Sequence, residues 1–247
     1  MSDVIAKLTE PERDRRWPNR RPVDAATLIV VDESAKKPKV LMGRRRADLA
    51  FMPGHYVFPG GRVDRSDGDA PALDALAPDT ETRLLRDMKG RPTRRRARAL
   101  AMTAIRETFE ETGVLIGREN DACPITRAAD WQAFLDHEVM PLLSGIGFFA
   151  RAITPPRRPR RFDTRFFVIS ASNVAKTLPL DERPTDELED VVWVTLDEAK
   201  DLDIPVITEV VLDELAERLN QTGSIGPADV PVPFYYMQRD AFRREIL

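Results

Sequence analysis

RETFEETG, residues 106–113, is the stretch around which the chain is organised, because it places three carboxylates on one side of a predicted helix. At about 100° per residue, Glu107, Glu110 and Glu111 fall within roughly 100° of one another. Carboxylates at these helical spacings repel each other. A hard divalent cation such as Mg²⁺ or Mn²⁺, which takes oxygen ligands, would relieve that repulsion. A solvated acidic helix face is the alternative interpretation of an isolated E-x-x-E-E pattern.

The sequence on either side of this helix favours the metal site over the solvated face. Thr93 or Pro92 is expected to begin the helix, and Gly113 suits the left-handed position that ends one. Arginines in the first turns and glutamates in the last oppose the helix dipole, which is typical of a functional site. Upstream, FPGG at residues 58–61 predicts a bend at which the backbone can come close to a ligand or to a helix.

Together the two motifs resemble the Nudix hydrolase signature: a glycine, five residues, a glutamate, seven residues, then R-E-U-x-E-E-x-G-U, with U aliphatic or aromatic. Gly61 matches the opening glycine, and residues 106–114 match the closing half. The two halves are separated by about 31 extra residues, and Asp67 stands at the position of the first glutamate. A box interrupted in this way resembles the Nudix subgroup of peroxisomal coenzyme A diphosphatases.

This resemblance implies an α/β fold, a Nudix-type α/β/α sandwich with a mixed central sheet. It also implies a small nucleotide-type substrate and hydrolysis of the diphosphate linkage of a nucleoside diphosphate joined to another group, X. Coenzyme A or an acyl-coenzyme A is the leading candidate substrate. ADP-ribose, a dinucleotide and an oxidised nucleotide are the alternatives within the same enzyme class. A non-catalytic nucleotide sensor on the same fold, or a nucleic-acid-binding module that uses the arginine runs, would belong to a different class.

The predicted active site combines the acidic helix with the glycine bend. Glu107, Glu110 and Glu111 are the expected ligands of Mg²⁺ or Mn²⁺, and the resemblance adds a backbone carbonyl at Gly61. Arg106 can orient Glu110, four residues on, by a charge-assisted bond. Gly60 is expected to lie against the substrate.

Several carboxylates are candidates for the general base that activates the attacking water. Glu107 and Glu111 lie within the box, whereas Glu182 and Glu187 lie in the acidic loop at residues 181–190, where Glu187 is favoured. A solvated loop is the alternative interpretation of those acidic residues.

Arginines outside the helix are the candidates for binding the substrate. Arg44 and Arg45 precede the FPGG bend and could contact a diphosphate, or could simply fringe the sheet. Arg165 lies in FDTRFFVISA, residues 162–171, which extends the resemblance, and is expected near the substrate unless it is an exposed strand arginine.

Composition excludes several other classes of protein. The 247 residues carry a net charge of −3, which does not suggest a nucleic-acid scaffold or a nucleic-acid partner. One cysteine rules out an intrachain disulfide, and two histidines that are far apart in the sequence argue against a zinc site. No stretch reaches about 18 apolar residues and no signal core is evident, so we expect a cytoplasmic protein with no membrane partner.

The expected organisation is a single domain at residues 23–220, with an arm at 1–22 and a tail at 221–247 packed on the domain. The insertion at about 68–92 within the box is expected to be a surface excursion that either covers the site or is a passive elaboration. An amphipathic helix at 196–219, broken or started by Pro205, presents an apolar stripe for the core or for a homodimer. Further expected elements are strands at 23–32, 40–45, 114–117, 148–153, 162–171 and 191–195, and helices at 80–88 and 126–144.

Overall fold

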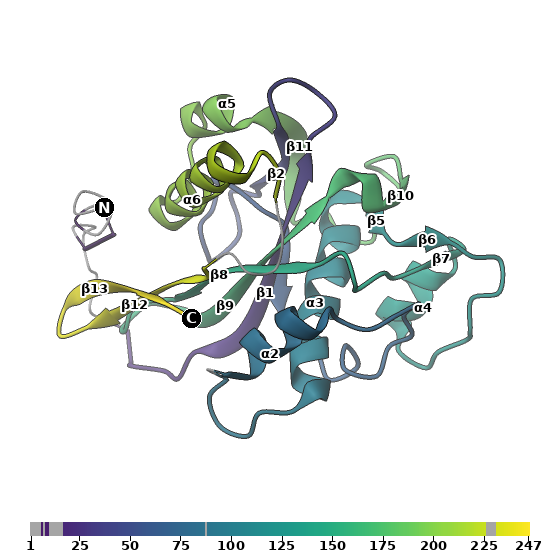
Figure 1. Cartoon of the computed structure of the whole chain (residues 1–247), viewed down its shortest axis with the longest axis horizontal. Helices are drawn as coiled ribbons and strands as arrows, with labels where there is room; N and C mark the ends of the chain where they lie inside the picture. The colour runs from purple at the N-terminus through teal and green to yellow at the C-terminus, as the bar shows by residue number, and fades with distance from the viewer. Residues whose placement is uncertain (1–5, 7, 10–16, 87, 226–230) are drawn as a thin grey trace.

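A mixed β-sheet between two layers of helices forms the body of the molecule in a computed structural model that describes residues 6, 8–9, 17–86, 88–225 and 231–247 (Figure 1). Strands β1 and β9 pair in parallel, as do β8 and β12, and the other pairs are antiparallel. The sheet runs in the order β11 (Leu188–Thr195), β2 (Lys39–Arg45), β1 (Val23–Asp32), β9 (Phe162–Ser170), β8 (Gly147–Ile153), β12 (Pro233–Gln238) and β13 (Ala241–Ile246).

The sheet opens between β1 and β2, and this opening positions the functional site. The two strands pair at Val31 and Asp32, near the end of β1. Toward the start of β1, the short strand β4 (Gly60–Arg62) pairs with β1 instead, while β3 (Tyr56–Val57) pairs with β2. The FPGG bend joins β3 to β4, and the Leu28 amide donates to the Pro59 carbonyl at 3.0 Å. The bend is therefore inserted where the two strands part.

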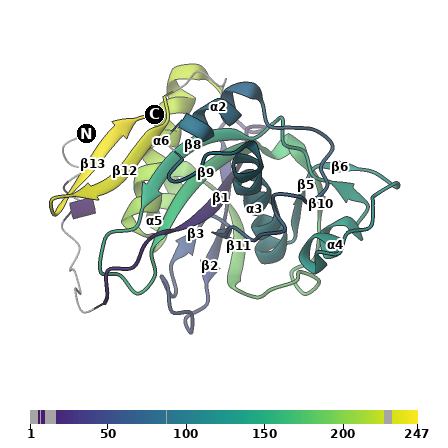
Figure 2. The ribbon, with the colours of Figure 1, turned by 90° about the horizontal axis from the view of Figure 1, so that it is seen from below.

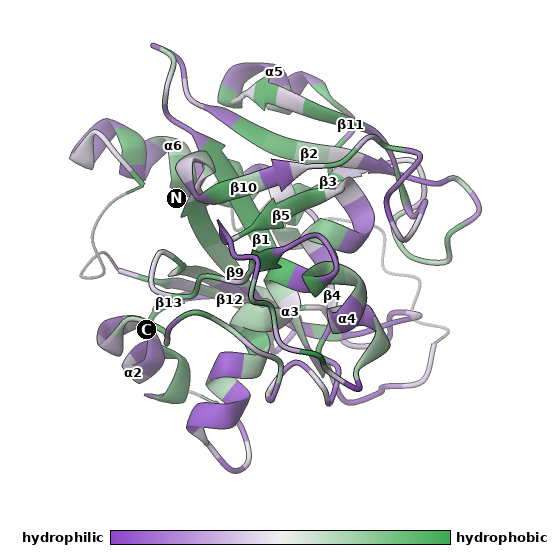
Figure 3. Ribbon diagram, turned by 90° about the vertical axis from the view of Figure 1, so that its right-hand side faces the viewer, coloured by the Kyte–Doolittle hydropathy of each residue, from purple (hydrophilic) through white to green (hydrophobic). Residues whose placement is uncertain are grey.

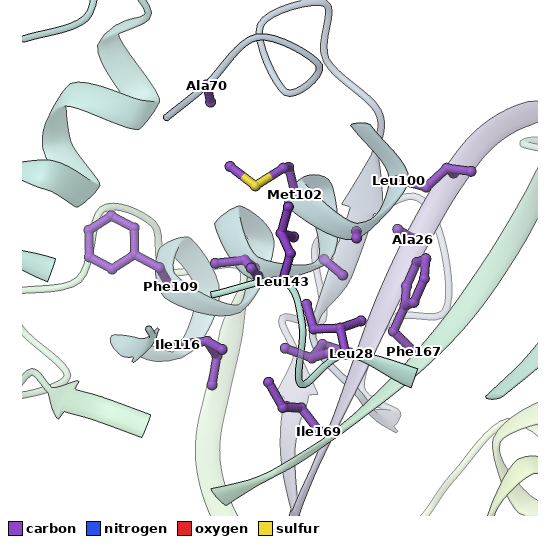
Figure 4. Packing of buried hydrophobic residues seen from close by; sticks show 14 of the residues in the cluster. Ala26, Leu28, Ala70, Leu100, Met102, Phe109, Ile116, Leu143, Phe167 and Ile169 are labelled. Atoms are coloured by element: carbon purple, nitrogen blue, oxygen red, sulfur yellow. The ribbon is translucent and has the colours of Figure 1, made fainter. Parts of the chain in front are cut away.

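Helix α3 (Arg94–Thr112) covers one face of the sheet and begins and ends as the sequence predicts. The Thr93 hydroxyl caps its start by accepting from the Arg96 amide, and Gly113 ends it at a φ of 74°. Figure 4 shows Leu28 and Phe167 of the sheet close to the side chains of α3. Burial of this face fixes the direction in which the acidic side of the helix points.

The opposite face is covered by α5 (Leu196–Asp201) and α6 (Val206–Thr222), as Figure 1 shows. Pro205 separates the two helices, which confirms the predicted break. Val210, Val211 and Leu215 of α6 pack with sheet residues in a second apolar cluster, so the predicted stripe belongs to the core. Together the three layers confirm the predicted α/β/α sandwich.

The insertion at residues 68–92 contributes to the core through α2 (Pro78–Arg86). Ala70, Leu76 and Leu84 are all buried in the cluster that includes α3. The expectation of a surface excursion is therefore wrong for these residues, because their apolar side chains need the shelter of α3.

Two expected elements differ in length or place. The helix expected at residues 126–144 is limited to α4 (Ala129–Leu135), after which β7 (Val139–Met140) pairs with β6 (Arg118–Glu119). The strand after Gly113, β5 (Val114–Ile116), pairs with β10 (Val174–Thr177) in a small sheet of its own, and a 3-10 turn (Ala171–Asn173) precedes β10.

The C-terminal segment completes the sheet. The hairpin of β12 and β13 lies at one edge, where β12 pairs with β8 (Figure 2, yellow). Most of the expected arm at residues 1–22 lies outside the described residues, although Leu8 is buried in the cluster beneath α6. The inner strands β1 and β9 are rich in hydrophobic residues (Figure 3). Among the described helices, none is both long and apolar enough to cross a membrane.

Candidate active site

A cavity of about 380 Å³ lies where β1 and β2 part, on the face of the sheet that carries α6. Its lining residues come from both layers of helices as well as from the sheet. Glu107 and Glu111 come from α3, Ile207 and Thr208 from α6, and Gly60 and Gly61 from β4. The acidic helix and the glycine bend, which are distant in sequence, therefore meet at one cavity.

Arg106 holds the glutamates of α3 in place. Its Nη1 donates to Glu107 Oε1 at 3.0 Å and to Glu110 Oε2 at 2.9 Å. Its Nε and Nη2 donate to Asp67 at 2.9 and 3.1 Å, and Nη2 also reaches the Arg62 carbonyl at 3.1 Å. The side chain is only 6% exposed, so these bonds are sheltered from water. Arg106 thus links the two halves of the interrupted box.

Asp67, for which the sequence predicts no role, is a hydrogen-bonding partner of Arg106. Its carboxylate is fully buried and, besides Arg106, accepts from Trp131 Nε1 at 2.9 Å and from Thr103 Oγ1 at 2.7 Å. The Asp64 amide donates to it as well, at 2.8 Å. The signal that could have identified Asp67 is its position, because it stands where the signature has its first glutamate.

Glycines 60 and 61 leave no room for a side chain, because Gly60 lies against Ala26 and Thr27 of β1 and Gly61 lies against Glu107. The Gly60 amide donates to Glu111 Oε2 at 2.9 Å. A Cβ atom at Gly61 would lie 2.4 Å from the carboxyl carbon of Glu107, a distance that real Cβ atoms do not show. The FPGG motif therefore brings the backbone of Gly60 and Gly61 beside two carboxylates, as its sequence predicts.

Burial disfavours the negative charge of all three glutamates. It raises the pKa of Glu107, and it raises the pKa of Glu110 to about 7 against the opposing attraction of Arg106. The pKa of Glu111 is raised well above its usual range by burial and then by the charge of Glu107. Burial therefore favours the protonated form of these carboxyl groups, and a bound divalent cation would favour their charged form instead.

The donor atoms at the site suit Mg²⁺ or Mn²⁺. Carboxylate oxygens of Glu107 and Glu111 and the nearby backbone of Gly61 are all hard oxygen ligands. In the part of the chain that the structure describes, no group of three or more His, Cys, Asp or Glu side chains forms a ready-made cage. Mg²⁺ is commonly held by one or two carboxylates and keeps several waters, so the site fits such an ion.

Two more of the residues singled out in the sequence line this cavity. Arg45 donates through Nε to the Phe51 carbonyl at 2.9 Å. Its Nη1 lies 4.0 Å from Glu111 Oε1, and its Nη2 lies 3.6 Å from Glu187 Oε2. Glu187 is half exposed and also faces the cavity. The structure thus brings Arg45, Glu187 and the box residues together.

Four residues of the predicted site do not belong to the described residues that line the cavity: Arg44, Arg106, Glu110 and Arg165. Arg44 pairs with Asp190 at 2.6 Å and with Glu189 at 3.2 Å. Glu110 is bonded to Arg106 at the edge of the cluster.

Arg165 is the predicted substrate residue whose surroundings differ most from the expectation. It is 2% exposed and pairs with Asp24 and Asp163, at 2.8 and 3.2 Å. Its neighbours on β9, Thr164 and Phe166, line the cavity instead. Successive side chains of a strand point to opposite faces, so Arg165 points toward the α3 layer.

The apolar part of the cavity was not foreseen from the sequence. It is formed largely by aromatic and aliphatic side chains, including Phe51, Ile153, Phe166, Ile207 and Phe242. The alternation of side chains along β9 indicates which of its residues share a face of the sheet. The sequence does not show which other elements pack against that face.

Comparisons with known proteins bear on this arrangement. Residues 20–203 match the family model described as NUDT19 Nudix domain. The Caenorhabditis elegans protein named "Putative nudix hydrolase 7" is 26% identical over 189 residues, which cover 72% of this chain and 52% of that protein. The chain therefore spans about half the length of the curated relative that it matches. A crystal structure of a NUDIX hydrolase from Alicyclobacillus acidocaldarius superimposes with a TM-score of 0.57 and 27% identity, covering 84% of this chain and 99% of the other.

Proposed function

The chain belongs to the Nudix hydrolase family, in the group described by the NUDT19 Nudix domain, and from this premise we propose that it hydrolyses a diphosphate linkage with Mg²⁺ or Mn²⁺. The substrate class is a nucleoside diphosphate joined to another group, X. The observation that carries the proposal is the meeting of Glu107, Glu111 and the Gly60–Gly61 backbone at one cavity beside Arg45.

Coenzyme A or an acyl-coenzyme A is the substrate that we propose first. Two features support it: the match to the NUDT19 group and the insertion that divides the box between Gly61 and Arg106. ADP-ribose, dinucleotides and oxidised nucleotides remain the alternatives for X. The cavity is large enough to hold more than a diphosphate, which is consistent with a substrate that has a sizeable group on one side.

In this proposal Glu107 and Glu111 hold the divalent cation from within the cavity, with Glu110 at its edge and the Gly61 carbonyl beside it. The cation supplies neutralisation of phosphate charge and a lowered pKa for bound water. Arg106 keeps Glu107 and Glu110 oriented through its paired hydrogen bonds. These ligands therefore need no large rearrangement before substrate binds.

Two further polar residues of the cavity bind the substrate and accept a proton from the attacking water. Arg45 binds a phosphate oxygen through the Nη atoms that face the cavity, because its ion-pair distances of 4.0 and 3.6 Å leave those donors only loosely engaged. Glu187 accepts the proton of the attacking water, since its carboxylate is half exposed and faces the same space. The Gly60 amide fixes the carboxylate of Glu111.

Turnover of a small panel of substrates tests the proposal. Coenzyme A, acetyl-coenzyme A, ADP-ribose, NADH and a diadenosine polyphosphate are incubated with the protein and Mg²⁺ or Mn²⁺, and phosphorylated products are measured. We expect metal-dependent hydrolysis that falls by about a hundredfold or more in Glu107→Gln. Glu189→Gln is the matched control, because Glu189 pairs with Arg44 and does not line the cavity.

Two results would contradict this function. Hydrolysis that survives complete removal of divalent cations would exclude the proposed metal site. A ligand from the panel that raises the melting temperature while none is hydrolysed would favour the non-catalytic sensor instead.

A further inference from the structure

The cavity extends far beyond the glutamates. Its lining residues run across the sheet from Gly60 and Gly61 on β4, through β1, β9 and β8, to Phe242 on β13. These strands are separated by five spacings of about 4.8 Å, which amount to roughly 24 Å before the twist of the sheet is considered. A diphosphate bound at the glutamates would fill only one end.

The two ends differ in chemistry. Glu107, Glu111 and Arg45 lie at the end formed by α3, β2 and β4. Along β8, β9 and β13 the cavity has an apolar wall made of Ala152, Ile153, Phe166 and Phe242, with the hydroxyl of Thr164. The first turn of α6 adds Ile207 and Thr208 to the lining, and it follows Asp203, whose carbonyl accepts from the Tyr56 amide of β3. Arg160 comes from the loop that joins β8 to β9, and its side chain is exposed. The apolar wall lacks the several hydrogen-bonding groups that usually recognise a nucleobase.

Part of the lining lies outside the segment that matches the family model, residues 20–203. Ile207 comes from α6, and Phe242 comes from the C-terminal hairpin (Figure 2). The hairpin is hydrogen-bonded to α6 at Glu214, which accepts from the Tyr235 hydroxyl and from Arg244 Nε at 2.8 Å. Pairing of β12 with β8 adds a second attachment. Phe242, which is 6% exposed, is therefore held in place as a fixed wall.

We propose that the far end of the cavity binds an apolar chain carried on the X group of the substrate and that Phe242 sets the longest chain accepted. This inference rests on the proposed function, because the diphosphate must lie against the glutamates for a chain to extend toward β13. Each methylene buried against the apolar wall strengthens binding about fourfold, until the chain meets the ring of Phe242. Longer chains would then have to displace a buried ring that belongs to the apolar cluster beneath α6.

Hydrolysis of acyl-coenzyme A substrates with acyl chains from two to sixteen carbons tests the proposal. The measured quantity is kcat/KM for each chain relative to that for the acetyl substrate. In Phe242→Ala we expect the chain length of maximal kcat/KM to increase by about two to four carbons, with a gain of roughly tenfold for the longest chains. In Phe242→Trp we expect the maximum to move to shorter chains, because the larger ring occupies the end of the cavity.

Phe234→Leu is the matched control. Phe234 is an aromatic residue of the same hairpin, but it packs over the Arg151 guanidinium and does not line the cavity among the described residues. The chain-length profile should be unchanged in this variant. A profile that is the same in wild type, Phe242→Ala and Phe242→Trp would overturn the proposal, and so would an equal shift in Phe234→Leu.

A binding measurement separates this inference from the proposed function. Fluorescence of 11-(dansylamino)undecanoic acid reports occupancy of an apolar site without hydrolysis. We expect binding to wild type, weaker binding by about tenfold in Phe242→Trp, and displacement by long-chain but not short-chain acyl-coenzyme A. If the probe binds in this way while no substrate is hydrolysed, the hydrolase fails and the apolar site stands. If ADP displaces the probe as well as a long acyl chain does, the far end holds a nucleobase and this inference is wrong.

Discussion

Two ionic clusters lie at the α3 side of the sheet, and they are unbalanced in opposite directions. In the acidic cluster, the guanidinium of Arg106 is bonded to three carboxylates, those of Asp67, Glu107 and Glu110. In the basic cluster, as far as the described residues show, the two carboxylates of Asp24 and Asp163 pair with three guanidiniums, those of Arg96, Arg151 and Arg165. Both clusters are largely buried, so their charges are poorly screened by water.

The pKa shifts follow this difference. Although burial disfavours the charge of Asp24, the guanidiniums of Arg165 and Arg96 lower its pKa. In the acidic cluster, burial raises the pKa of Glu107 and Glu110 despite the presence of Arg106. A cluster in which every carboxylate has its cation serves to hold strands together. A cluster with unbalanced carboxylates beside a cavity is suited to bind a cation from outside.

The largest effect that we expect from this comparison concerns the stability of the folded chain. Asp163→Asn removes the carboxylate charge with which the buried Arg151 and Arg165 both pair, and should lower the free energy of unfolding by about 3–5 kcal/mol. Asp67→Asn removes one carboxylate from a cluster with too many, and should cost roughly half as much. Urea unfolding in metal-free buffer gives both values.

The difference between the two losses of unfolding free energy tests the distinction between the clusters. An Asn at position 67 can still accept from Trp131 through its one carbonyl oxygen. Its NH2 group can donate to the Thr103 hydroxyl, which keeps its own bond to the Ala99 carbonyl, and this limits the loss. An equal or larger loss in Asp67→Asn would mean that the acidic cluster is held together as tightly as the basic one, and the distinction between them would fail.

A smaller effect of about 1–3 kcal/mol is expected from Mg²⁺ at concentrations well above its dissociation constant. The folded pKa of Glu110, about 7, lies above its usual value of 4.5, so between these pH values the folded chain keeps a proton that the unfolded chain has lost. The metal-free protein therefore loses stability as pH rises through this window. Ligand carboxylates must be deprotonated, so Mg²⁺ should raise the melting temperature more at pH 8 than at pH 5.5.

Glu107→Gln tests the site of this ion, because it removes one proposed ligand without changing the basic cluster to which Asp163 belongs. In that variant the Mg²⁺-dependent rise in melting temperature should fall to a small fraction of its wild-type value. A rise of equal size at both pH values, or one that persists in Glu107→Gln, would place the ion elsewhere.

The contrast between the clusters also shows what the sequence can and cannot predict. The caps and the acidic side of α3 are local, since Thr93, Gly113 and the glutamates lie within one helix, and they led to the Nudix fold and family that the comparisons confirm. The partners of Asp67 are not local. Arg106 lies 39 residues away and Trp131 lies 64 residues away, and only the folded chain brings them together.

Similar reasons account for the other differences. Residues 68–92 are rich in alanine, proline and aspartate and show no clear period, yet four of their apolar side chains are buried in the cluster that includes α3. Arg165 was expected at the substrate because its strand was recognised, but the face to which a strand residue points depends on register, which places Thr164 and Phe166 at the cavity instead. The C-terminal hairpin lacks the Asn-Gly type of turn, with Arg239 and Asp240 at positive φ in its place.

The smallest effects distinguish two neighbouring arginines, one engaged by carboxylates and one facing the acidic cluster. Arg44 is held by Asp190 at 2.6 Å and by Glu189, whereas Arg45 approaches Glu111 and Glu187 only at 4.0 and 3.6 Å. Arg45→Gln should raise KM about tenfold, equivalent to about 1.4 kcal/mol, because a phosphate oxygen loses its cation. Arg44→Gln should change KM less than about twofold, since exposed ion pairs contribute about 0–1 kcal/mol. Both variants keep strand β2 intact, so steady-state kinetics with the best substrate of the panel compares them directly. Equal effects in the two variants would show that substrate binds along the outer edge of β2 as well, and that the loosely paired arginine has no special part in recognising the diphosphate.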